Sequence, residues 1–317
     1  MASKKIVKHN HLKKATRMIR PPFRAHSSLP RSRDMILEAK KCDDSPQTLS
    51  PSYRLAFDDP EFLLQDEQRA VRLLLEWQKP DQILNAHEIK ATWPIFGSAR
   101  IHDEEQSLQK IQQLERKQQQ NPNNELLQQQ LHAAIQLHRK SSYYQECVRL
   151  AQQLSDPDNT GIDATVVTGG GPGIMEAANK GASLAGKKSI GLNIVLPTEQ
   201  EPNAYISPEY CFQFHYFAIR KMHFLARAKA LFAFPGGFGT LDEVMETLTL
   251  IQTRRLNLMP IFLFGAEFWN KVINFDALVE EGVISARDKE LFQFVETAEE
   301  AIAGVNAFYQ KHPEQTE

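Results

Sequence analysis

The sequence predicts an α/β protein with a doubly wound, mostly parallel β-sheet. After residue 160, short apolar runs alternate with helical patterns, which is typical of a parallel sheet covered by helices on both faces. Glycine-rich turns directly follow two of these apolar runs. The chain has 317 residues, 42% of them hydrophobic, and is long enough for one large domain or two modest ones.

Residues 1–33 are expected to form a basic, disordered arm. They hold ten Lys/Arg, no Asp/Glu and three prolines, with little apolar content. They lack the apolar core of a secretory signal. A transit peptide would be amphipathic, and this segment is not clearly so. The remaining 284 residues carry 27 Lys/Arg against 39 Asp/Glu, a formal charge of −12. This acidic body gives no reason to expect a nucleic-acid partner.

Residues 34–90 are expected to form a helical extension. Asp59 can cap a helix whose first position suits Pro60. We expect this helix to end at Lys79-Pro80, because the residue before a proline disfavours helical backbone. Its apolar stripe consists of Phe62, Leu63, Val71, Leu74, Leu75 and Trp77.

Residues 91–317 are predicted to form a Rossmann-like domain. Its first strand, 92–97, contains Pro94, which lacks the N–H that a sheet ladder needs. Ligands of such folds bind at the carboxyl ends of the strands. The further strands are expected at 164–168, 189–196, 211–217, 231–235, 260–264 and 291–295, and helices at 172–185, 218–230, 241–256, 266–280 and 297–310.

Residues 103–154 are expected to be a helical hairpin inserted into this domain. They contain 14 glutamines and no glycine, with one break at Asn121-Pro122, where Asn can cap the second helix. A glutamine-rich helical face is typical of a solvated or oligomer-contacting surface.

The first glycine loop is Gly169-Gly170-Gly171-Pro172-Gly173, directly after a predicted strand and at the start of a helix. Glycines let a backbone approach an anion, and the free N–H groups of a helix start point at it. The spacing is neither GxGxxG nor GxxxxGK[ST], so no dinucleotide or nucleoside-triphosphate site is indicated. The pattern favours phosphate binding, and the alternative is that these glycines serve close packing only.

The second glycine loop is Gly236-Gly237-Phe238-Gly239-Thr240, also between a strand and a helix. Backbone donors and a hydroxyl suit phosphate binding. Glu243 is expected in the first turn of the following helix, facing the same mouth. It either has a chemical role there or only complements the helix dipole.

Three segments of the sequence together resemble the LOG (Lonely Guy) family: 169–182 (GGGPGIMEAANKGA), Arg220-Lys221 and 235–243 (PGGFGTLDE). Members are phosphoribohydrolases that cleave nucleoside 5′-monophosphates, with cytokinin riboside monophosphates as the named plant substrates. The resemblance covers roughly residues 90–310, apart from the insert. Many members were labelled lysine decarboxylases, but no lysine here has the surroundings of a pyridoxal-phosphate site.

The resemblance implies catalytic roles for Arg220 and Glu243. It implies neither a cofactor nor a metal, and the ten histidines show no HExxH or Cys/His clustering. His215 and His223 are expected to be packing or surface residues. The resemblance also implies a homodimer or larger homo-oligomer. The phosphate- and nucleotide-binding residues would be Gly97, Ser98, Gly170, Gly171, Gly173, Met175, Gly236, Gly237, Gly239 and Thr240.

The expected function is hydrolysis of the N-glycosidic bond of a nucleoside 5′-monophosphate to free base and ribose 5-phosphate. A non-catalytic mononucleotide sensor and a ribosyl-phosphate transferase are the alternatives, and the presence of both Arg220 and Glu243 favours an enzyme. No run approaches the ~18 apolar residues of a membrane span, so no membrane partner is expected. The three cysteines have no close spacing, which fits a cytoplasmic protein rather than a disulfide scaffold or CxxC zinc site.

Overall fold

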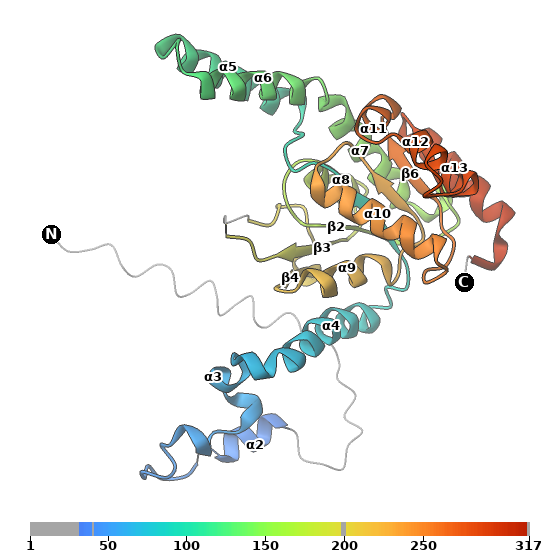
Figure 1. Cartoon of the computed structure of the whole chain (residues 1–317). Coiled ribbons are helices and arrows are strands. Elements are labelled where there is room, and N and C mark those ends of the chain that lie inside the picture. The colour runs from blue at the N-terminus through green and yellow to red at the C-terminus, as the bar shows by residue number, and fades with distance from the viewer. Residues whose placement is uncertain (1–31, 40, 198–200, 316–317) are drawn as a thin grey trace. The chain divides into compact units, whose positions relative to one another are not determined.

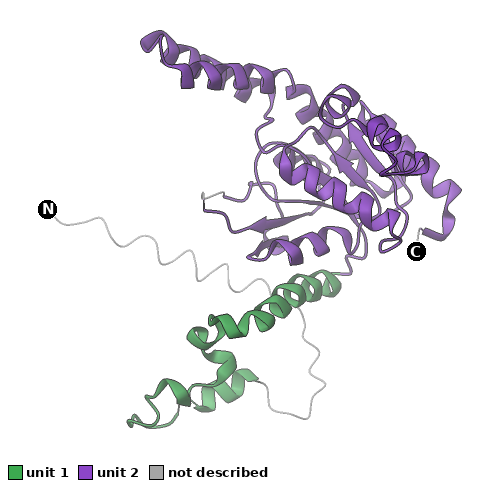
Figure 2. Cartoon of the chain, viewed as in Figure 1, with its two compact units in different colours: residues 1–87 green, residues 88–317 purple. Residues whose placement is uncertain are grey.

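The computed structural model describes residues 32–39, 41–197 and 201–315 (Figure 1). The predicted disordered arm lies outside the described residues up to position 31. The chain divides into two compact units, residues 1–87 and 88–317 (Figure 2). Each unit is described by itself below.

The first unit contains the helices α2 (Ser32–Ala39), α3 (Pro60–Leu63) and α4 (Arg69–Ala86). The Asp59 carboxylate caps α3 by accepting the backbone N–H groups of Glu61 and Phe62 at 3.1 and 3.3 Å. The predicted helix end at Lys79-Pro80 is wrong, because Pro80 lies inside α4. Pro80 and Leu84 are both buried, so packing of this face outweighs the hydrogen bond that proline removes.

The second unit is built on a seven-stranded sheet in the order β4-β3-β2-β1-β5-β6-β7. Every neighbouring pair is parallel. The chain starts at the centre of the sheet, winds to one edge and then to the other, which confirms the doubly wound α/β prediction. The strands are β1 (Thr92–Phe96), β2 (Thr165–Thr168), β3 (Ser189–Ile194), β4 (Cys211–Phe214), β5 (Leu231–Ala233), β6 (Ile261–Phe264) and β7 (Phe292–Val295).

Helices cover both faces of this sheet (Figure 1). Ile95 of β1 and Phe232 of β5 belong to a core shared with α7, α8 and α13, whereas Phe96 meets Phe224 of α9 at 4.8 Å between ring centroids. The predicted helix 266–280 is divided at Asn274, whose side chain caps a new helix by accepting the N–H of Ala277. The helices are α7 (Ser141–Leu154), α8 (Ile174–Leu184), α9 (Phe217–Leu225), α10 (Phe238–Gln252), α11 (Ala266–Val272), α12 (Phe275–Glu280) and α13 (Ala298–Lys311).

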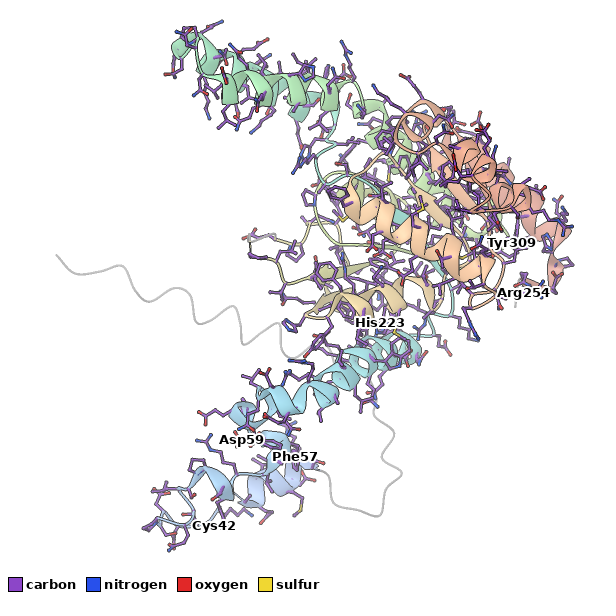
Figure 3. All side chains as sticks on the ribbon, in the orientation of Figure 1. Cys42, Phe57, Asp59, His223, Arg254 and Tyr309 are labelled. Atoms are coloured by element: carbon purple, nitrogen blue, oxygen red, sulfur yellow. The ribbon has the colours of Figure 1, made fainter. Side chains whose placement is uncertain are left out.

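Pro94 lies in the central strand β1, where a local shift of register accommodates it. Thr92 lies opposite Ala228 and Phe96 opposite Ala233, so the β5 side contains one extra residue. Sheets tolerate proline at such bulges. At this point the Lys229 carbonyl accepts a hydrogen bond from the hydroxyl of Tyr309, a residue labelled in Figure 3.

The predicted insert 103–154 contains three helices rather than two. Only α5 (Glu104–Gln120) and α6 (Glu125–His138) form a hairpin, which extends from the body in Figure 1. The third, α7, buries Tyr144, Cys147 and Leu150 in the core and connects β1 to β2. The second hairpin helix is capped by Asn124 instead of Asn121, since the Asn124 side chain accepts the Leu127 N–H. Within the described ranges, no helix has the length and apolar character needed to cross a membrane.

Candidate active site

A cavity of about 760 Å³ opens at the carboxyl ends of the strands, where β1 and β5 lie side by side. This is where the winding of the sheet reverses, the usual ligand position in such folds, and the volume is typical of small-molecule sites. Of the predicted site residues, the cavity brings together Gly97, Ser98, Met175, Arg220, Gly236, Gly237, Gly239, Thr240 and Glu243. Gly170, Gly171 and Gly173 are not among its lining residues.

The second glycine loop is open toward the cavity. A Cβ atom added at Gly237 or Gly239 would meet no atom within 4 Å. The Gly237 carbonyl accepts the N–H groups of Thr240 and Leu241, each at 3.0 Å, and so begins α10. The positive end of the α10 dipole and its first N–H groups are therefore exposed at the mouth, an arrangement suited to an anion.

The first glycine loop is packed by its neighbours. Gly170 and Gly173 have φ of +78° and +68°, and a Cβ atom would overlap the Asn193 side chain at Gly170 and the Ser98 carbonyl at Gly173. The Asn203 side chain donates to the carbonyls of Gly170 and Gly171 at 3.2 and 3.0 Å. These contacts favour the packing alternative for this loop.

The helix after the packed loop also begins against protein. The N–H of Ile174, the first residue of α8, donates to the Ser98 carbonyl at 3.1 Å. The α8 start therefore offers a ligand fewer free donors than the α10 start does.

Glu243 is a buried carboxylate in the cavity, with only 6% of its surface exposed. It lies in the second turn of α10 rather than the first, because the helix already begins at Phe238. Among the described residues, its Oε2 atom has no hydrogen-bond partner. Burial raises the pKa of Glu243 to about 7, although the nearby charges of Lys221 and Arg220 act to lower it. A carboxyl group with this pKa can accept and release protons near neutral pH.

Arg220 of α9 is held in a fixed position beside the cavity. Its Nε donates to the Leu192 carbonyl at 2.7 Å, and its guanidinium carbon lies 5.2 Å from the centre of the Phe224 ring. Burial lowers the pKa of Arg220, while Glu243 opposes this shift. Arginine nonetheless remains charged at neutral pH. The site therefore pairs a fixed cation with a proton-accepting carboxylate.

Lys221, the residue after Arg220, does not line the cavity. Its Nζ lies 2.9 Å from both Asp242 Oδ1 and Glu246 Oε2, so it links α9 to the flank of α10. Burial alone would lower the pKa of Lys221, but its bonds to Glu246 and Asp242 raise it.

The structure adds cavity residues that the sequence analysis missed. Asn193 at the end of β3 and Arg100 after the Gly97-Ser98 turn both line the cavity, as do Phe217, Phe238 and Phe268. The position of Arg100, a cation three residues after Gly97, was a sequence signal that could have predicted it as a site residue. Nothing in the strand pattern marked Asn193 as one. The predicted packing residue His223 is 4% exposed on α9, with its ring 5.5 Å from that of Phe214 (Figure 3).

Comparison with known proteins adds names to this geometry. The family model "Possible lysine decarboxylase" matches residues 175–305, which include Arg220, Glu243 and the open loop. The chain is 28% identical over 178 residues to cytokinin riboside 5′-monophosphate phosphoribohydrolase LOG3 of Arabidopsis thaliana, covering 55% of this chain and 79% of the relative. It is also 28% identical over 174 residues to the probable phosphoribohydrolase LOGL5 of Oryza sativa subsp. japonica, covering 54% and 68%.

Among solved structures, the molybdenum cofactor carrier protein of Chlamydomonas reinhardtii aligns with a TM-score of 0.40 at 19% identity, covering 70% of this chain and 99% of that one.

The residues of the cavity do not fit the decarboxylase in the family model's name. Pyridoxal-phosphate chemistry needs a lysine for the Schiff base, and no lysine is among the described residues that line the cavity.

Proposed function

We propose that the chain, which resembles the LOG family in its family match and its relatives, hydrolyses nucleoside 5′-monophosphates to free base and ribose 5-phosphate. The observation that carries this proposal is the buried Glu243, with a pKa of about 7, in one cavity with Arg220 and the open start of α10. The relatives named above are phosphoribohydrolases of cytokinin riboside 5′-monophosphate. AMP and cytokinin riboside monophosphates are therefore the first substrates to test.

In this proposal the open loop binds the 5′-phosphate. The start of α10 supplies a helix dipole and backbone N–H groups, and Thr240 adds a hydroxyl. The phosphate does not react. Its binding energy positions the ribose over Glu243.

Glu243 then acts on the reacting carbon. Cleavage of an N-riboside passes through a state with positive charge at C1′, which a nearby carboxylate stabilises. The ionised Glu243 also accepts a proton from the attacking water, whose oxygen forms the new bond to C1′ as the C1′–N bond breaks. The departing base takes up a proton, and Arg220 stabilises negative charge on that base or on the phosphate.

The two alternatives make different use of these residues. A mononucleotide sensor needs the phosphate site but gains nothing from a buried carboxylate whose Oε2 has no hydrogen-bond partner among the described residues, which costs stability. A ribosyl-phosphate transferase would use the same residues with an acceptor other than water. The observations at Glu243 therefore favour an enzyme over a sensor.

One assay separates the three functions. The protein is incubated with a panel of nucleoside monophosphates, and ribose 5-phosphate and free base are measured. We expect both products in equal amounts without any added acceptor. Nucleotide binding without products would identify a sensor, and products that appear only with a second substrate would identify a transferase.

We also propose that the protein forms at least a dimer. The hairpin exposes Leu108 and Leu126 at 40% and 62% of their surfaces, and an oligomer contact would cover them. Light scattering at micromolar concentration is expected to give twice the chain mass or more. An active monomer would contradict this proposal.

A further inference from the structure

A second cavity, of about 530 Å³, lies at the hairpin of α5 and α6. Its walls come from both hairpin helices and from the segment after β1 that contains Arg100. The hairpin lies outside residues 175–305, the part that the family model matches. The proposed hydrolysis uses none of the hairpin residues, so this cavity calls for its own explanation.

The wall chemistry of the hairpin cavity is divided. Leu114 and Ala134 are 5% and 8% exposed and give it an apolar floor together with Leu137. Arg100 and Lys110 are exposed cations at its edge, and among the described lining residues none is acidic. A cationic edge above an apolar floor is complementary to a small molecule with an anionic group and an apolar part.

Arg100 belongs to both cavities. It is among the residues that line the hairpin cavity and among those that line the candidate active site. Its backbone N–H donates to Ser98 Oγ at 3.1 Å, which ties it to the turn after β1. An anion in the hairpin cavity would therefore engage a cation that also serves the substrate site.

We propose that the hairpin cavity is a second ligand site for a small amphipathic anion, coupled to the active site through Arg100. A bound anion pairs with Lys110 and Arg100 while its apolar part covers the floor. The coupling, which rests on the proposed function, weakens nucleotide binding because one guanidinium cannot neutralise two anions. By linkage, the nucleotide weakens the second ligand by the same factor.

The test of the site uses two fluorescent probes with the full chain. One is the anionic 8-anilinonaphthalene-1-sulfonate, and the other is the uncharged N-phenyl-1-naphthylamine. Ala133 lines the cavity on α6, so Ala133→Phe fills it, whereas His132→Phe adds the same ring at the exposed neighbour outside the lining. We expect Ala133→Phe to weaken binding of both probes at least tenfold relative to His132→Phe. Equal binding to the two variants would overturn the site.

The charge of the ligand is tested at Lys110. Lys110→Glu is expected to weaken the sulfonate probe about tenfold and to leave the uncharged probe unchanged, because it reverses one exposed charge at the edge. Equal loss of both probes, or of neither, would overturn the anionic class of ligand. Ala133→Phe and Lys110→Glu both change surface residues of the hairpin, and circular dichroism checks that the hairpin helices remain folded.

The coupling is measured without catalysis. Calorimetric titration of Glu243→Gln with AMP is expected to give a several-fold weaker affinity at saturating sulfonate probe, and this effect should be absent in the Ala133→Phe background. An unchanged AMP affinity would overturn coupling through Arg100. A protein that binds the probe but no AMP would overturn the proposed function and leave the hairpin site standing.

Discussion

The loop after β2 and the loop after β5 flank β1 at the carboxyl ends of the strands, and Gly170 and Gly173 of the first differ in their surroundings from Gly237 and Gly239 of the second. Asn193 and Ser98 occupy the space where side chains of Gly170 and Gly173 would lie, whereas Gly237 and Gly239 have no neighbours there. Glycine therefore allows close protein packing in one loop and leaves room beside a helix start in the other. Glycine spacing alone cannot distinguish these two uses.

The acidic residues after the two loops differ in the same way. Glu176 follows the packed loop and accepts a hydrogen bond from the Tyr144 hydroxyl at 3.0 Å. Glu243 follows the open loop, is more deeply buried, and has an Oε2 atom without a partner among the described residues. A carboxylate that the protein already satisfies is structural, and one left unsatisfied beside a cavity is available for chemistry.

Removing the unsatisfied carboxylate is the change with the largest expected effect. Glu243→Gln is expected to lower turnover of AMP at least a hundredfold, on the scale of ~3 kcal/mol for deleting one preorganised electrostatic group. Binding of ribose 5-phosphate should survive, because the open loop is intact. Steady-state kinetics and calorimetry measure the two quantities.

Glu176→Gln is the matched control for this experiment, since it makes the same chemical change after the packed loop. Its turnover should stay close to that of the unaltered protein. A comparable loss of turnover in both variants would mean that the difference between the two carboxylates does not determine activity.

The next largest effect concerns the phosphate, which we propose the open loop binds. Adenosine lacks this group and forfeits two or three charge-assisted hydrogen bonds at ~1.5 kcal/mol or more each. We expect kcat/KM at least ~100-fold lower for adenosine than for AMP. Similar efficiencies for the two would show that both loops serve packing.

A pair of alanine substitutions compares the loops directly. Gly237→Ala places a methyl group in open space, so the melting temperature should not change while kcat/KM for AMP falls about tenfold or more. Gly173→Ala combines a positive φ with a clash against the Ser98 carbonyl, and should cost roughly 1–3 kcal/mol of stability. Thermal unfolding and AMP kinetics on both variants give the answer, and an exchange of the two phenotypes would reverse the comparison.

The sequence alone locates much of this architecture, for identifiable reasons. Buried parallel strands are continuous apolar runs, so 260–264 and 164–168 fall within a residue or two of β6 and β2. The rule that ligands bind at strand ends placed the glycine loops and Glu243 at the site, and the family resemblance added Arg220; the structure brings both side chains into one cavity.

What the sequence could not predict depends on contacts between distant residues. The packed state of the first loop depends on Asn203, more than 30 positions away. Helix α7 directly follows the glutamine-rich hairpin in the sequence. Its burial depends on packing against α8 and α13. Pro80 stays helical because its face is buried, which outweighs local backbone preference.

The smallest expected effect is a pH dependence that arises from Glu243, the carboxyl group after the open loop. Burial holds the pKa of Glu243 near 7, above its ordinary value of 4.5, so the ionised form that accepts a proton predominates only above pH 7. The value of kcat/KM for AMP should therefore rise about tenfold from pH 6 to pH 8.

Because the folded pKa is the higher one, this group's contribution to stability is complete below pH 4.5 and is lost as the pH rises through 7. Glu243→Gln cannot ionise, so its melting temperature should gain on that of the unaltered protein between pH 5 and pH 8. A difference between Glu243→Gln and the unaltered protein that is the same at both pH values would place the ionisation of Glu243 outside this range and remove it as the proton acceptor.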